Sequence, residues 1–185
     1  MPVRILVGGR SGEDSMTGHE ARPSVGEVTL RDVTKGDLSV FFEHQLDPEA
    51  NRMAIFPARS RDAYMVHWER ILYEETVTTK TVLVDGKVAG SVVSFEQDGK
   101  PEVGYWLGRG YWDKGIVTAA LSAFVELVRV RPLYAHVAKH NVASIRILEK
   151  CGFEISGEEN GPSDVPGEEA EGLILALRAE SGPAR

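Results

Sequence analysis

Cysteine is almost missing from this 185-residue sequence, which has only Cys151. One cysteine cannot form an internal disulfide, so the sequence fits a reducing cytosol better than a disulfide-stabilised secreted scaffold. Long hydrophobic runs are missing as well. No stretch approaches the length of a membrane span, and Val3 to Val7 is too short for the core of a signal peptide. We therefore expect a cytoplasmic chain without a membrane partner.

Basic residues are in the minority, with 21 Lys and Arg against 28 Asp and Glu and a net charge of -7. This balance, without any basic stripe, argues against a nucleic-acid partner. The acidity would favour a cationic amine as substrate, but it is equally common in proteins that are acidic only for solubility. A 42% share of hydrophobic residues in 185 is enough for one domain with a sizeable core.

The N-terminal half predicts helices and strands after a segment without periodicity. Residues 1–26 carry glycine, serine and mixed charges, so we expect a flexible extension before a domain over 27–178 and a tail over 179–185. Apolar spacing and turn residues then predict a strand at 27–32, helices at 37–46 and 60–74 on either side of a loop at 47–57, and strands at 78–84, 88–96 and 102–107.

The most informative stretch is 103–118, where a strand runs through a glycine-marked turn into an amphipathic helix. Gly108 and Gly110 are expected to supply turn conformations with positive φ, and Gly115 removes a Cβ where a ligand would approach the backbone. The unpaired amides and the dipole at such a helix start favour a phosphate. Taken alone, the pattern is equally typical of a plain turn. The buried stripe of the helix is expected at Val117, Ala120, Leu121, Phe124, Leu127 and Val128.

A second motif follows a short strand at 133–137. Asn141 is a good N-cap for a helix that ends at Gly152, a residue suited to the left-handed position after a helix. Strands at 153–157 and 172–177 complete the sheet, joined by an acidic loop at 158–171. That loop either attracts a cationic acceptor or is only solvated.

Together these motifs resemble the GNAT superfamily of acetyl-CoA-dependent N-acetyltransferases, and within it the ribosomal-protein N-terminal acetyltransferases. Trp112-Asp113-Lys114-Gly115-Ile116-Val117 is similar to the Arg/Gln-x-x-Gly-x-Gly/Ala pyrophosphate loop, and Asn141-x-x-Ser144-x-Arg146-x-Leu148-Glu149-Lys150-x-Gly152-Phe153 to the second motif. The resemblance covers about residues 27–177. It implies one mixed α/β domain with a central twisted mixed sheet flanked by helices. Trp112 and Val117 depart from the family pattern, and Asp113 places a carboxylate beside the pyrophosphate or merely caps the helix.

The resemblance implies direct attack of a neutral primary amine on acetyl-CoA, without a metal. The implied cofactor contacts are the backbone of Trp106 and Leu107 at the acetyl carbonyl, the loop Trp112, Asp113, Lys114, Gly115, Ile116, Val117 and Thr118 at the pyrophosphate, and Asn141 at the pantetheine arm. Ser144 either protonates the departing thiolate or forms reciprocal helix-start bonds with Asn141. Glu102 is the leading general base, with Glu96 behind it, and Arg109 could reach a phosphate.

The amine acceptor cannot be identified from the sequence. Candidates for its pocket, which packing explains equally well, are Met53, Phe56, Tyr64, His67 and Trp68. His136 and His140 are expected to have packing or surface roles, because no pair of histidines has metal-site spacing. The chain is expected to be a monomer or a homodimer. The alternative function is a non-catalytic acyl-CoA-binding module of the same fold.

Overall fold

The computed structural model describes residues 26–54, 58–162 and 169–179. The expected extension therefore lies outside the described residues except for Gly26. So do Phe56, most of the C-terminal tail and the middle of the predicted acidic loop.

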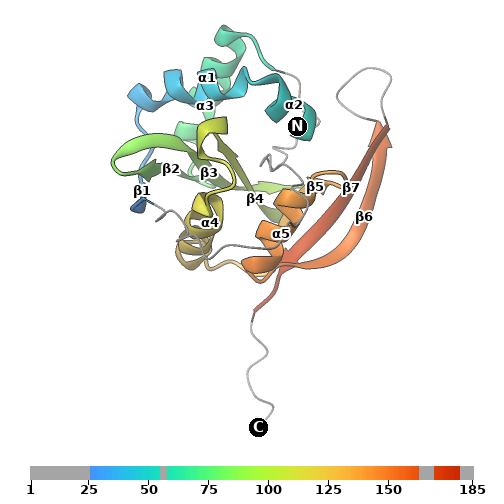
Figure 1. Cartoon of the computed structure of the whole chain (residues 1–185). Coiled ribbons are helices and arrows are strands. Elements are labelled where there is room, and N and C mark those ends of the chain that lie inside the picture. The colour runs from blue at the N-terminus through green and yellow to red at the C-terminus, as the bar shows by residue number, and fades with distance from the viewer. Residues whose placement is uncertain (1–25, 55–57, 163–168, 180–185) are drawn as a thin grey trace, which may run out of the picture.

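A single seven-stranded mixed sheet forms the centre of the molecule, with strand order β1-β2-β3-β4-β5-β7-β6 (Figure 1). Neighbouring strands are antiparallel except β4 and β5, which are parallel. This confirms the expected mixed sheet. The strands are β1 (Val28–Arg31), β2 (Thr78–Val84), β3 (Lys87–Gln97), β4 (Lys100–Leu107), β5 (Leu133–Ala138), β6 (Glu154–Pro162) and β7 (Glu169–Leu177).

Two tight turns set the register of β2, β3 and β4. Asp85 and Gly86 have φ of 49° and 75°, and Asp98 and Gly99 have φ of 51° and 73°. Paired positive φ values are typical of two-residue hairpin turns, whose twist matches that of the strands. The predicted turn at 85–87 is confirmed, and the second turn lets β4 begin at Lys100 rather than Glu102.

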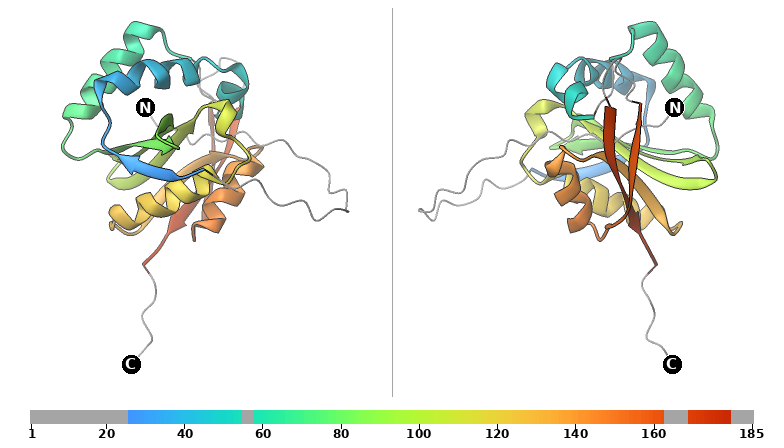
Figure 2. Two further views of the ribbon diagram at one scale, coloured as in Figure 1. Left: turned by 60° about the vertical axis from the view of Figure 1, so that its left-hand side comes forward. Right: turned by 90° about the vertical axis from the view of Figure 1, so that its right-hand side faces the viewer.

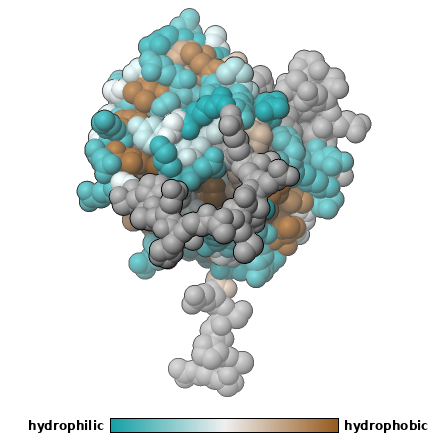
Figure 3. Space-filling view, in the orientation of Figure 1, coloured by the Kyte–Doolittle hydropathy of each residue, from teal (hydrophilic) through white to brown (hydrophobic). Residues whose placement is uncertain are grey.

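Helices cover both faces of the sheet (Figure 2). One face carries α1 (Leu38–Gln45) and α3 (Arg61–Tyr73), and the other carries α4 (Ile116–Leu127) and α5 (Val142–Lys150). Helix α2 (Pro48–Ala54) contributes Ala50 and Ala54 to the same core cluster as α4 and α5. Short 3-10 turns precede α1 (η1, Lys35–Asp37) and α4 (η2, Arg109–Tyr111). On the face drawn in Figure 3 hydrophilic residues cover most of the described surface, and the hydrophobic areas between them are small.

Helix α2 corrects the predicted loop at 47–57. Pro48, expected to stop a helix, occupies its first position, where the missing N–H costs nothing and the fixed φ is already helical. Asp47 caps this start, because its Oδ1 accepts hydrogen bonds from the amides of Glu49 at 2.9 Å and Ala50 at 3.0 Å.

The long hairpin of β6 and β7 corrects the predicted loop at 158–171. The two strands stay paired from Glu154↔Ala176 to Pro162↔Glu169, so only 163–168 lies outside the described residues. We predicted a loop because acidic residues and glycine have a low strand propensity. The hydrogen-bonded ladder between β6 and β7 outweighs that propensity.

The core has one layer on each side of the sheet. Phe124, Leu133, Leu148 and Leu175 are fully buried in the layer under α4 and α5. Leu127 was predicted to lie on the buried stripe of α4, but it is 58% exposed because the helix ends there. The stripe consists instead of Ile116, Val117, Ala120, Leu121, Phe124 and Val125.

Candidate active site

The sheet divides between β4 and β5. These parallel strands share one residue pair, Glu102↔Tyr134, after which the described residues of β4 and β5 form no further pairing. Strand β4 continues to Leu107 beside β3, and β5 continues to Ala138 beside β7. The backbone of Trp106 and Leu107 thus lies beyond the point at which β4 and β5 stop pairing.

A cleft of about 660 Å³ opens among α2, the start of α4 and α5. It brings together the two motifs singled out in the sequence, since the loop before α4 lies on one wall and α5 on the other. The lining residues are Glu49, Arg52, Met53, Tyr111, Asp113, Gly115, Ile116, Val117, Thr118, His140, Val142, Ala143, Arg146, Ile147 and Lys150.

The start of α4 points unpaired backbone donors at this cleft. Gly115 is the N-cap in the left-handed conformation, with φ of 72°, and has no side chain to cap the helix. The first bond of the helix runs from the Ala119 amide to the Gly115 carbonyl at 3.1 Å. The amides of Ile116, Val117 and Thr118 precede that bond and have no partner within the helix. An anion at this position would be stabilised by these amides and by the helix dipole.

The two other glycines of the loop do not have the positive φ that we predicted. Gly108 has φ of -61°, and Gly110 is not among the residues with positive φ. Gly108 serves close approach instead, because a Cβ there would lie 2.5 Å from Nε2 of His44. Asp113 has a left-handed conformation with φ of 59°, and Gly115 rather than Asp113 occupies the N-cap position, without a capping side chain. Asp113 lines the cleft and does not cap the helix.

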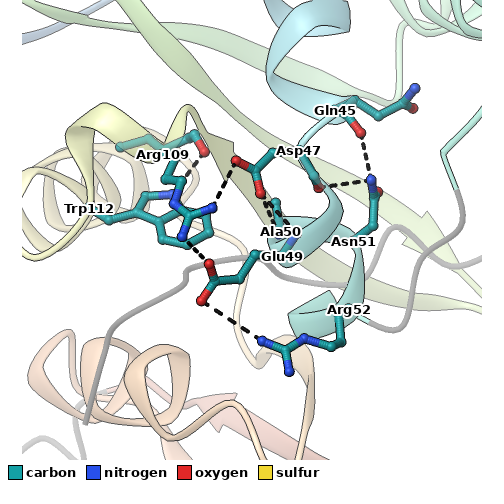
Figure 4. Close-up of polar contacts among 9 residues, drawn as sticks. Gln45, Asp47, Glu49, Ala50, Asn51, Arg52, Arg109 and Trp112 are labelled. Carbon is teal, nitrogen blue, oxygen red and sulfur yellow. Dashed lines mark hydrogen bonds and ion pairs between the residues drawn. The ribbon is translucent and has the colours of Figure 1, made fainter.

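Arg109 is held by α2 and does not line the cleft. Its guanidinium forms an ion pair with Glu49, approaches Asp47 Oδ2 at 3.6 Å and lies over the ring of Trp112, as Figure 4 shows. Trp112 is buried, and its Nε1 donates to the Leu107 carbonyl at 3.0 Å. These contacts connect α2, the loop before α4 and the end of β4. Arg109 therefore has a structural role here, whereas the sequence suggested only that it could reach a phosphate.

The charge inside the cleft is slightly positive. Arg52, Arg146 and Lys150 line it against Glu49 and Asp113. Lys114, the predicted counter-charge of Asp113, donates to the Gly110 carbonyl at 2.7 Å and is not a lining residue.

Asn141 lies fully buried at the start of α5. Its Oδ1 accepts from the Ser144 amide at 3.2 Å, which confirms the predicted cap. Its Nδ2 donates to the Met53 carbonyl at 3.4 Å and so links α5 to α2. Both helices that it joins contribute residues to the cleft.

Two buried hydroxyls lie behind this helix start. Ser144 is fully buried, and neither its Oγ nor the hydroxyl of Tyr105 has a well-formed hydrogen bond to a described residue. Burial raises the pKa of Tyr105, and the neighbouring Ser144 hydroxyl opposes that rise, so the two groups lie close together. Only half of the reciprocal bond between Asn141 and Ser144 is present, because the Ser144 hydroxyl does not take part.

Glu102 is 4% exposed and belongs to a chain of charged side chains that the sequence did not reveal. Nε2 of His136 lies 3.1 Å from Oε1 of Glu102, and Nδ1 lies 2.8 Å from Oε2 of Glu159. The hydrogen bond with Glu102 raises the pKa of His136 most, burial opposes it, and Glu159 adds to the rise. We expected only a packing or surface role for His136. The contact with Glu102 could not be foreseen, because it depends on the parallel pairing of β4 with β5.

A separate small pocket, of about 60 Å³, lies between α1, α3 and strands β3 and β4. Tyr64, His67 and Trp68 line it, whereas Met53 lines the large cleft, so the structure does not gather the candidate acceptor residues into one pocket. Burial is the main cause that lowers the pKa of His67 to about 4, with Arg59 and Arg70 adding to it.

Within residues 26–54, 58–162 and 169–179, no three His, Cys, Asp or Glu side chains gather to hold a metal ion. In the same ranges no helix is both long and apolar enough to cross a membrane.

Comparisons with known proteins connect this geometry to a family. The chain is 25% identical over 144 residues to an uncharacterized N-acetyltransferase, p20, of Bacillus licheniformis, covering 70% of this chain and 80% of the relative. Its fold is similar to spermidine N-acetyltransferase from Vibrio cholerae in complex with CoA and spermine, with a TM-score of 0.69, 15% identity and coverage of 81% and 95%. It is also similar to an aminoglycoside acetyltransferase in complex with coenzyme A and kanamycin, with a TM-score of 0.65, 22% identity and the same coverage of 81% and 95%.

The family model described as the acetyltransferase (GNAT) domain matches residues 27–154. That span contains strands β1 to β5 with the division between β4 and β5, the start of α4 and all of α5. The chain therefore belongs to the GNAT family of acetyl-CoA-dependent N-acetyltransferases.

Proposed function

We propose that this protein transfers an acetyl group from acetyl-CoA to a primary amine by direct attack in a ternary complex. The observation that carries the proposal is the uncapped start of α4, which faces a cleft of about 660 Å³ with basic side chains on the opposite wall. Phosphate groups favour such a combination of backbone amides and cations. The related folds with CoA and amines in their binding sites support the same assignment.

In the proposed complex, the backbone from Asp113 to Thr118 surrounds the pyrophosphate. The Leu107 amide polarises the acetyl carbonyl, because β4 has left β5 at that point and a ligand can take the place of the missing strand. The Trp106 amide faces β3, as the Gly108 amide does in its bond to the Ala89 carbonyl, so Trp106 borders the acetyl group without donating to it. The neutral amine forms an N–C bond, the C–S bond breaks, one amine proton leaves, and CoA departs as a thiol. Holding both reactants in one cleft supplies much of the acceleration.

Ser144 is the proposed donor of the proton to the thiolate. Its hydroxyl lies at the start of α5, buried and without a well-formed bond to a described residue, so a proton can be given up without breaking an existing contact. In this proposal Asn141 contacts the pantetheine arm from its position as the N-cap, while its side chain holds the Ser144 amide.

Glu102 is the proposed general base. It lies four residues before Trp106, about 13 Å along a strand, so the amine proton would reach it through water. Nε2 of His136 lies 3.1 Å from Oε1 of Glu102 and holds this carboxylate in place. Glu96 is a weaker candidate, since it is exposed and lies in a different groove near Asp98.

We further propose that the chain resembles the ribosomal-protein N-terminal acetyltransferases in mechanism and acts in the cytoplasm. The proposed partners are acetyl-CoA and the amine only, without nucleic acid or membrane, and the protein acts as a monomer or homodimer. The alternative, a non-catalytic acyl-CoA-binding module, is favoured by the Asp113 carboxylate on the cleft wall.

The first test is calorimetric titration of the protein with acetyl-CoA. We expect Gly115→Glu to abolish binding, because it places a carboxylate among the amides at the start of α4. Gly115→Ala is the control for backbone strain at positive φ, and it should bind more tightly than the glutamate variant. Gly110→Glu is the control for charge, since a Cβ there meets nothing within 4 Å.

If the folded wild-type protein does not bind acetyl-CoA, the proposed function is wrong. If Gly110→Glu abolishes binding as completely as Gly115→Glu, the loop before α4 acts through general charge, and the assignment of the amides fails. Binding without acetylation of any amine in a broad panel would favour the non-catalytic module.

A further inference from the structure

The small pocket borders the place where the acetyl group would lie. Ser91 pairs with Trp106 and Val93 with Gly104, so these residues share a face of the sheet, and Val93 packs against α1 and α3. Trp106 lines the pocket, and the next residue, Leu107, has the amide proposed for the acetyl carbonyl. An amine that attacks from this face of the sheet would therefore place its amino group in the pocket.

A buried acceptor of this pocket has no donor. Gln45, the last residue of α1, lines the pocket and is 2% exposed. Its Oε1 has no hydrogen-bond partner among the described residues. Buried side-chain oxygens are normally hydrogen-bonded, so an unpaired oxygen beside the proposed reaction site is suited to an N–H of a bound molecule.

Two contacts fix the position of Gln45. Its Nε2 donates to the Arg59 carbonyl at 3.2 Å, so the nitrogen end of the amide group is engaged and the oxygen end is left for another donor. Its backbone carbonyl accepts from Nδ2 of Asn51 at 2.8 Å, as Figure 4 shows. Asn51 belongs to α2, which also lines the large cleft. One helix thus connects the unpaired oxygen with the proposed acetyl-CoA site.

The two N–H groups of a neutral primary amine have different fates in the transfer. One hydrogen leaves as the proton that Glu102 receives through water. The other stays on the nitrogen and becomes the N–H of the product amide. A secondary amine has only the hydrogen that leaves. An acceptor fixed beside the nitrogen can therefore hold the second N–H of a primary amine from attack to product, and it finds no such group in a secondary amine.

We propose that Gln45 selects primary amines: its Oε1 accepts the N–H that stays on the nitrogen and so directs the lone pair at the thioester carbon. This inference rests on the proposed function, because the pocket receives the amino group only if acetyl-CoA lies against β4. The transfer is balanced as before. The N–C bond forms, the C–S bond breaks, one proton leaves the nitrogen, and CoA departs as a thiol. A secondary amine would place an alkyl group against the oxygen and leave it unpaired.

The test compares butylamine with N-methylbutylamine, in which a methyl group replaces one N–H. In the wild-type protein we expect kcat/KM for butylamine to be higher by about tenfold or more, because the methyl group leaves a buried acceptor without its donor. Gln45→Leu removes the acceptor and should reduce this preference to about threefold or less, mainly by lowering kcat/KM for butylamine. Calorimetry should show that the variant still binds acetyl-CoA.

Ile71→Val is the matched control, because Ile71 lines the same pocket without a polar side-chain atom. This change should alter kcat/KM for both amines by similar factors. If Gln45→Leu does not fold, inhibition of the wild-type protein takes its place. Butanol offers an O–H to the Gln45 oxygen and butyl methyl ether does not, so butanol should compete with butylamine more strongly. Equal inhibition by the two compounds would overturn the role of Gln45.

The outcomes separate this inference from the proposed function. A failure of the folded wild-type protein to bind acetyl-CoA would overturn both. Equal kcat/KM for the two amines in the wild-type protein, or an unchanged preference in folded Gln45→Leu, would overturn this inference alone. If acetyl-CoA binds but neither amine is acetylated, thermal melting of the CoA complex decides. A rise in Tm with butylamine that Gln45→Leu removes would support the inference. No rise, or the same rise in the variant, would overturn it.

Discussion

At the scale of single residues, the contact with the clearest pH signature is His136 between two carboxylates. Glu102 is its buried partner, Glu159 its more exposed one, and both favour the protonated imidazole. Lys139, which directly follows β5, is engaged with Glu158 instead. A histidine with a raised pKa stabilises the fold below its unfolded pKa of about 6.5, and it loses that contribution as the pH rises through the folded pKa.

We predict that the free energy of unfolding, measured with urea at a series of pH values, decreases above about pH 6.5 through this histidine. Glu102→Gln should remove most of the effect, on the order of 2 kcal/mol for a hydrogen bond to a charged group. Glu159→Gln, the matched change at the weaker and more exposed partner, should remove less. Equal effects of the two variants, or a difference from wild type that does not vary with pH, would contradict the assignment.

At the scale of elements, α2 forms a wall of the cleft that several contacts hold in place. Asp47 caps the helix, Glu49 pairs with Arg109 of the loop before α4, and the Met53 carbonyl accepts from Asn141. Asp47 has two functions here, since its second oxygen lies 3.6 Å from Arg109. The cap and the charge can be separated by the choice of substitution.

We expect Asp47→Ala to lower the free energy of unfolding by about 1 kcal/mol through loss of the cap and to weaken acetyl-CoA binding as α2 loosens. Asp47→Asn keeps a capping oxygen and removes only the charge, so it should remain near wild type in both measurements. Chemical denaturation and calorimetric titration of the two variants check this. If asparagine is as damaging as alanine, the contact with Arg109 outweighs the cap.

The elements also show which features can be predicted from sequence. The start of α4, the Asn141 cap and the hairpin turn at 85–87 depend on residues close together in the chain, and the prediction of each was correct. Helix α2 was not predicted, because a proline in the sequence can either follow the end of one helix or occupy the first position of the next, and Pro48 does the second. The contacts of Arg109 with Glu49 and of Glu102 with His136 join distant segments, and sheet register and helix packing alone bring them together.

At the scale of the whole molecule, the charge of the cleft is opposite to that of the protein. The chain carries a net charge of -7, yet three cations and two carboxylates line the cleft. A polyanion such as acetyl-CoA is therefore repelled by the molecule as a whole and attracted only locally. Local attraction of this kind is screened by salt over about 8 to 10 Å at physiological ionic strength.

We predict that the affinity for acetyl-CoA decreases as the salt concentration rises, measured by calorimetry from low to high ionic strength. Arg146→Gln should weaken binding by about tenfold and make it less sensitive to salt, because one cation of the cleft is lost. Arg129→Gln is the matched control, since Arg129 is exposed beyond the C-terminus of α4 and does not line the cleft. Equal losses in the two variants would mean that the total charge, rather than the cleft, governs binding.

The single pairing between β4 and β5 also affects how the protein unfolds. Strands β1 to β4 form one hydrogen-bonded ladder and β5 to β7 another, and the two ladders share only the pair Glu102↔Tyr134. Both ladders pack on one hydrophobic core, and we expect any subglobal opening to separate them at this single pairing rather than within either ladder. A molecule bonded to both edges would couple these ladders, so that neither could open without releasing it.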